Sequence, residues 1–69
     1  MTKHILVEVR NYPQDNLDFY IATIYVENKY IISSKGELLE TVMSDIYGEL
    51  SEIIRDFTGR GFTVEIKEK

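Results

Sequence analysis

The feature that most constrains the fold is an amphipathic segment at residues 36–57, with strand-like sequence on both sides. Its apolar side chains recur at spacings of three and four, which is the period of a helix with one buried face. These side chains are Leu39, Val42, Met43, Ile46, Leu50, Ile53, Ile54 and Phe57. Ser34 and Glu37 match a capping box that opens a helix, and Gly59 fits a left-handed cap that ends one. The pattern predicts one long helix.

The flanking segments alternate between apolar and polar residues or are rich in β-branched and aromatic ones, as strands are. The expected strands are residues 3–10, 17–27, 30–33 and 62–67. A polar loop is expected at residues 12–16 and a tight turn at Asn28-Lys29. Short hairpins make the first three strands antiparallel, and the helical crossover sets the fourth parallel to the first.

The sequence therefore predicts a single α+β domain over residues 1–69 with the element order βββαβ. The expected sheet order is 3-2-1-4, with the helix covering one face. Phe62, Val64 and Ile66 of the last strand are expected to point inward. Residues 17–27 are apolar on both sides, with Phe19, Ile21 and Tyr25 on one and Tyr20, Ala22, Ile24 and Val26 on the other.

A two-sided apolar strand needs cover on both faces, and the sequence offers no second layer. Chains this short often depend on oligomerisation for stability. We therefore expect a homo-oligomer, a dimer, whose interface draws on the second strand. The expected interface residues are Phe19, Ile21, Ile24 and Tyr25, with the choice of sheet face left open.

Acidic side chains gather in the helical segment. Residues 36–58 carry six acids against Arg55 alone, a net charge of −5, while the rest of the chain carries +1 within an overall −4. One flank of the helix collects four of them: Asp45, Glu49, Glu52 and Asp56. Like charges at these spacings repel one another. The flank is predicted to bind a basic protein partner, and the alternative is a solvated face partly neutralised by lysines.

The composition excludes several kinds of site. The chain has no cysteine and only His4, so disulfides, thiolate metal sites and histidine-rich metal sites are excluded. We expect no cofactor and no enzymatic activity. The carboxylates Glu8, Glu40 and Glu65 are the candidates for a nuclease-like metal site, but cross-strand charge pairing explains Glu8 and Glu65 better. Tyr20, Tyr25 and Tyr30 could stack on bases, but a pI of about 4.8 does not fit a nucleic-acid groove.

Gly36, Glu37, Leu39 and Glu40 stand in order at the start of the expected helix. This motif resembles HicB-type antitoxin domains, which are similar to a truncated RNase H fold of three strands, a helix and a fourth strand. The resemblance covers nearly the whole chain in topology and residues 33–42 in motif. The family's Pro and Gly-Cys before the third strand are replaced here by residues 25–28, and its C-terminal DNA-binding segment is absent. The resemblance implies a phage or mobile-element module that binds a protein.

The sequence leads to one favoured function and two alternatives. The favoured one is a small acidic, non-enzymatic module, antitoxin-like or inhibitor-like, that masks a basic nucleic-acid-binding protein. The alternatives are a structural homo-oligomeric subunit without an inhibitory role and a degenerate RNase H-like nuclease. The start of the chain leads into a strand rather than a signal peptide, and no apolar run is long enough for a membrane span. We expect a cytoplasmic protein with no direct contact to nucleic acid or membrane.

Overall fold

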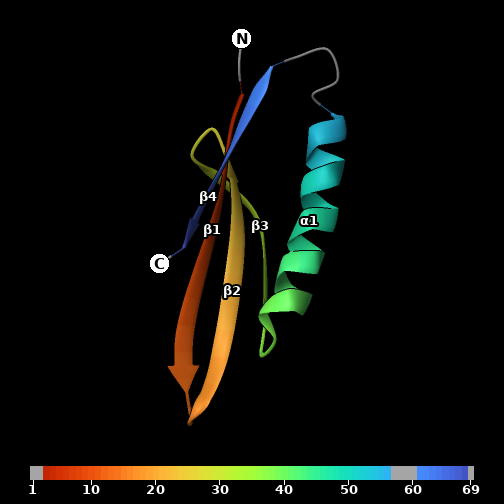
Figure 1. Cartoon of the computed structure of the whole chain (residues 1–69). Coiled ribbons are helices and arrows are strands. Elements are labelled where there is room, and N and C mark those ends of the chain that lie inside the picture. Colours follow the sequence, from red (N-terminus) through yellow and green to blue (C-terminus); the bar gives the residue numbers. More distant parts are fainter. Residues whose placement is uncertain (1–2, 57–60, 69) are drawn as a thin grey trace.

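The computed structural model describes residues 3–56 and 61–68, which form one mixed sheet and one helix (Figure 1). The elements are β1 Lys3–Gln14, β2 Leu17–Val26, β3 Lys29–Gly36, α1 Leu39–Arg55 and β4 Phe62–Glu68. The sheet order is β3-β2-β1-β4, with β1 antiparallel to β2 and parallel to β4. The α+β fold, the βββαβ order and the sheet order predicted from the sequence are confirmed.

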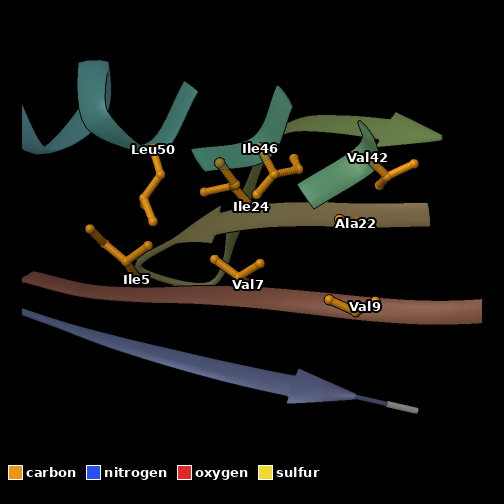
Figure 2. Packing of buried hydrophobic residues seen from close by; sticks show 8 residues of the cluster. All are labelled: Ile5, Val7, Val9, Ala22, Ile24, Val42, Ile46 and Leu50. Carbon is orange, nitrogen blue, oxygen red and sulfur yellow. The ribbon is translucent and has the colours of Figure 1, made fainter. Parts of the chain in front are cut away.

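The core lies between α1 and one face of the sheet. Its members are Ile5, Val7, Val9, Ala22, Ile24, Val42, Ile46 and Leu50 (Figure 2). The strand residues interdigitate because the register sets Val7 opposite Ile24 and Val9 opposite Ala22. Each fully buried isoleucine or valine contributes about 1.5–3 kcal/mol relative to its exposed state. This layer supplies most of the hydrophobic stabilisation that so short a chain can obtain.

The helix lies toward the β3 side of the sheet, so that it buries side chains of β1 but none of β4. It packs against β2 and β3, and no described Cα atom of β1 or β4 comes within 8 Å of a Cα atom in α1. Phe62, Val64 and Ile66 lie on the helix side, because Val64 pairs with Ile5 and Ile66 with Val7. They are nevertheless 39%, 41% and 49% exposed. Their predicted orientation is right, but the helix lies too far toward β3 to bury them.

The helix begins later than predicted. Ser34 and Gly36 belong to β3, where they pair with Ala22 and Tyr20, so the strand continues through the expected capping box. Leu38 is the N-cap and makes no side-chain capping bond. The long-range pairing with β2 thus prevails over the local helix-start signal. At the other end α1 finishes at Arg55, and the predicted stop at Gly59 lies outside the described residues.

The first hairpin is also longer than predicted. Pro13 lies in β1 opposite Asp18, within the segment expected to be a loop. The amide of Glu27 in the following turn donates a hydrogen bond to the carbonyl of His4 in β1. Since peptide groups alternate in direction along a strand, the even-numbered residues of β1 direct theirs toward β2 and the odd-numbered residues direct theirs away from it. After Val9, no described residue of β4 pairs with β1. Pro13, whose backbone nitrogen faces that side, therefore removes no hydrogen bond from the sheet. The paired strands extend past the start of α1 as a two-stranded arm (Figure 1).

Both hairpins close with two residues at positive φ. Asp15 and Asn16 have φ of 52° and 65°, and Glu27 and Asn28 have φ of 51° and 66°. Paired positive φ values match the turn whose twist suits antiparallel strands. The second turn therefore comes one residue earlier than predicted, at residues 27–28 rather than 28–29. Early closure lets β3 begin at Lys29, one residue before its predicted start.

We expect Ile24→Val to lower the free energy of unfolding by about 0.5–1.5 kcal/mol, because it opens a methyl-sized cavity in the core. Ile31→Val makes the same chemical change at a side chain that is 47% exposed. It should change stability by less than about 0.5 kcal/mol. Urea unfolding followed by circular dichroism measures both. Equal losses for the two variants would contradict the placement of the core.

Candidate protein-binding site

The sheet face opposite α1 carries a set of apolar side chains that no described element covers. We call it the open face, and its apolar members are Leu6, Tyr12, Phe19, Ile21, Tyr25, Tyr30 and Ile31. Their placement follows from strand alternation, since Ile5, Val7 and Val9 point toward the helix. The structure thus brings Phe19, Ile21 and Tyr25 together, as the sequence predicted for an interface.

Ile24 does not belong to this surface. It was predicted as an interface residue with the other three, but it is 0% exposed and lies beneath α1. Its neighbours across the ladders are Val7 and Ile32, both on the helix side. Alternation along β2 therefore assigns Ile24 to the core and Ile21 to the open face.

Aromatic pairs order the open face. Tyr12 and Phe19 stack across the β1–β2 arm with ring centroids 5.8 Å apart. Tyr25 and Tyr30 meet edge to face at 6.4 Å. Such pairs contribute about 0.5–1.5 kcal/mol beyond area burial, so they favour this arrangement of the rings. Sequence reasoning missed Tyr12 because it was assigned to a loop; alternation continued past Arg10 would have found it.

The three tyrosines considered and set aside as a base-stacking platform do not share one surface. Tyr20 lies on the helix side of β2 and packs against the core, whereas Tyr25 and Tyr30 lie on the open face. Stacking of successive bases needs aromatic rings on one side of a sheet. The three tyrosines therefore do not form a base-stacking platform together.

The two carboxylates of the open face, Glu8 and Glu65, are paired with cationic neighbours. Arg10 Nε lies 2.7 Å from Glu8 Oε1, and Lys67 Nζ lies 3.6 Å from Glu65 Oε1. His4 Nε2 lies 3.3 Å from Glu65 Oε2. Glu40 is on α1, across the sheet from these carboxylates. Within residues 3–56 and 61–68 no three His, Asp or Glu side chains form a group able to hold a metal ion.

The four predicted partner-binding acids do share one flank of α1. We call Asp45, Glu49, Glu52 and Asp56 the acidic flank. The flank faces the β3 side, because Ser34 of β3 donates a hydrogen bond to Asp45 at 3.2 Å. Glu49 is half-buried and the other three are exposed. None of the four is in an ion pair with another described residue, and Asp45 accepts the hydrogen bond from the Ser34 hydroxyl.

A shallow depression of about 320 Å³ lies where β3 gives way to α1. Gly36, Glu37, Leu38 and Thr41 line it, and Leu38 is 68% exposed. One carboxylate beside an aliphatic side chain offers no base, nucleophile or set of converging donors. The depression therefore offers apolar surface, and its lining residues do not form a catalytic arrangement.

No family model, curated protein or solved structure matches the chain. The resemblance to HicB-type domains thus stays a prediction. The structure sets its motif across the strand–helix junction, with Gly36 ending β3 and Leu39 beginning α1. As for membranes, the described part of the chain contains no helix with the length and apolarity that crossing a bilayer requires.

We expect the double change Glu49→Gln and Glu52→Gln to raise the free energy of unfolding by about 0.5 kcal/mol. It removes the like-charge contacts at spacings of four, three and four along the flank, while glutamine keeps the helix propensity. The gain should shrink at high salt, where the repulsion is screened. Urea titrations at low and high ionic strength measure it.

Glu40→Gln is the matched control. Glu40 lies in the first turn of α1, where a negative charge is favoured by the helix dipole, so its loss should lower stability slightly. If the double variant were also destabilised, mutual repulsion along the acidic flank would not be the dominant electrostatic term there.

Proposed function

We propose that this chain is a small non-enzymatic protein-binding module, antitoxin-like or inhibitor-like, that masks a basic nucleic-acid-binding protein. The observation that carries the proposal is the contrast between its charged surfaces. The open-face carboxylates Glu8 and Glu65 are paired with Arg10 and Lys67, whereas the acidic flank takes part in no ion pair among the described residues. A basic partner would supply the missing cations.

The two surfaces adjoin at β3, which is the sheet edge beside the acidic flank. Ser34 of this strand contacts Asp45, and Tyr30 and Ile31 of the same strand lie on the open face. A partner that wraps around β3 would meet negative charge on one side and apolar rings on the other. Charge would steer its approach, and desolvation of the rings would hold the complex.

We also propose that the chain has no enzymatic activity. Glu8 and Glu65 are paired with Arg10 and Lys67 on the open face, and Glu40 lies on α1. A two-metal nuclease requires its carboxylates to converge on one point. The arrangement therefore supports binding over catalysis. The proposal places the protein in the cytoplasm with its partner and assigns it no cofactor.

The proposal predicts a basic partner whose association depends on the acidic flank. Host proteins retained at low salt on the immobilised chain are purified and titrated by surface plasmon resonance. We expect the change of Glu49 and Glu52 to glutamine to slow association several-fold at low ionic strength and to flatten its salt dependence. Changing Glu37 and Glu40 to glutamine alters the net charge equally, away from the flank, and should have a smaller effect. Equal effects of both pairs, or only acidic partners, would overturn the proposal.

A second candidate, a homo-oligomeric subunit without an inhibitory role, is favoured by the apolar open face. Two copies packed through Phe19, Ile21 and Tyr25 would bury those side chains between two sheets. This candidate predicts that Ile21→Lys converts an oligomer to a species of 8.1 kDa in sedimentation equilibrium, because a packed contact opposes an inserted charge. Arg10→Lys, which keeps the charge at the paired position in β1, is the control. An unchanged mass for Ile21→Lys would rule out this face as the contact.

A further inference from the structure

The outer edge of β3 carries peptide groups that no other described strand pairs with. β3 lies at one end of the sheet, and β2 is its only neighbour among the described strands. Among the described residues, no hydrogen bond from outside the β2–β3 ladder reaches the backbone of β3. An edge of this kind is a template for a further strand.

The direction of the peptide groups along β3 follows from the ladders. The even-numbered residues of β1 direct theirs toward β2, so the odd-numbered residues of β2 that pair with them point back toward β1. The even-numbered residues of β2 therefore direct theirs toward β3. One of them, Ala22, pairs with Ser34. Alternation along β3 then sets the amides and carbonyls of Ser33 and Lys35 toward the outer edge.

The irregularity in the β2–β3 ladder does not reach these residues. It lies between Ile24 and Tyr25, and the pairing is regular from Ile24 with Ile32 to Tyr20 with Gly36. A bulge discourages strand addition where it occurs. Residues 32–36 are therefore the part of β3 to which a further strand can be added.

The acidic flank runs along this edge on the helix side of the sheet. Ser34 donates a hydrogen bond to Asp45 at 3.2 Å, which sets the start of the flank beside Ser34. α1 runs antiparallel to β3, so the flank continues from there toward the start of the strand (Figure 1). Four helix residues rise about 6 Å, and two strand residues rise about 6.6 Å. The step from Asp45 to Glu49 thus matches alternate residues of a strand laid along β3.

We propose that the basic partner binds by adding an extended segment to the outer edge of β3, with basic side chains at every second position. The inference rests on the proposed function and names how that partner is recognised. Side chains opposite Ile32 and Ser34 lie on the helix side, where the acidic flank faces them. The residues between them hydrogen-bond through their backbone to Ser33 and Lys35.

Lys35 sets the phase of the added segment. Its side chain is exposed on the open face, across the ladder from Ile21. Like charges opposite each other in a ladder are destabilising, so a basic residue is disfavoured opposite Lys35. One position away, on the helix side, the acidic flank favours it. The edge therefore selects a segment that alternates basic with neutral residues over one that is basic throughout.

The test uses the full chain and the synthetic peptide Lys-Thr-Arg-Val-Lys-Thr-Arg. We expect the peptide to bind at low ionic strength and to slow hydrogen exchange at the amides of Ser33 and Lys35, measured by nuclear magnetic resonance. The amide of Ser34, which already pairs with β2, is the internal reference. The same peptide with proline in place of each neutral residue keeps its charge but lacks the amides that face β3. It should bind about ten-fold more weakly.

Ser33→Pro removes the outward amide from the chain itself. The nitrogen of Ser33 faces away from β2, so the ladder with β2 should persist, and circular dichroism checks this. We expect about ten-fold weaker binding of the peptide, because an intermolecular backbone hydrogen bond is lost. Ser33→Ala removes the hydroxyl that contacts Tyr30 but keeps the amide, so this control should bind the peptide as the wild type does. If Ser33→Pro does not fold, the proline peptide tests the same bonds.

Strand addition and the proposed function fail in different ways. Binding that depends on Glu49 and Glu52 but is unaffected by Ser33→Pro and by proline in the peptide would overturn strand addition alone. Absence of peptide binding, or binding without slower exchange at Ser33 and Lys35, would also overturn it. If exchange slows at both amides but Glu49→Gln with Glu52→Gln leaves the affinity unchanged, the acidic flank does not recognise the basic residues, and both proposals are wrong.

Discussion

The position of one helix toward the β3 side of a four-stranded sheet determines the character of this molecule. α1 covers β2 and β3, and its apolar side chains close the core over Ile5, Val7 and Ile24. The chain contains no other helix among its described residues to cover β4 or the opposite face of the sheet. Apolar surface is therefore left at two places. A short chain cannot avoid this, because its surface is large relative to its volume.

Aromatic and charged pairs partly offset that exposure. The Tyr12–Phe19 stack lies on the arm, where β1 and β2 have no further strand beside them. A two-stranded ribbon is only marginally stable in water, so a cross-strand ring pair is a needed contribution. The pairing of Arg10 with Glu8 similarly neutralises charge beside Ile21. These contacts keep the open face ordered without covering it.

The sequence predicts the fold well where the signals are local and periodic. The alternation of β1, β2 and β4, the short hairpins and the three-four spacing of α1 together lead to the sheet order. Prediction fails where long-range pairing prevails over a local signal. Ser34 and Gly36 match a helix-start signal but pair with β2 in the sheet. Pro13 was expected in a loop but lies in β1, where its nitrogen faces a side without a described partner strand.

The candidate site was predictable to a similar degree. Helical periodicity alone places Asp45, Glu49, Glu52 and Asp56 on one flank, and the structure agrees. Strand alternation places Ile21 and Ile24 on opposite faces of the sheet, but it does not predict which of these faces packs against the helix. The exposure of Val64 was not predictable, because it depends on how far α1 lies toward β3. That position is set by side-chain packing between α1 and the sheet.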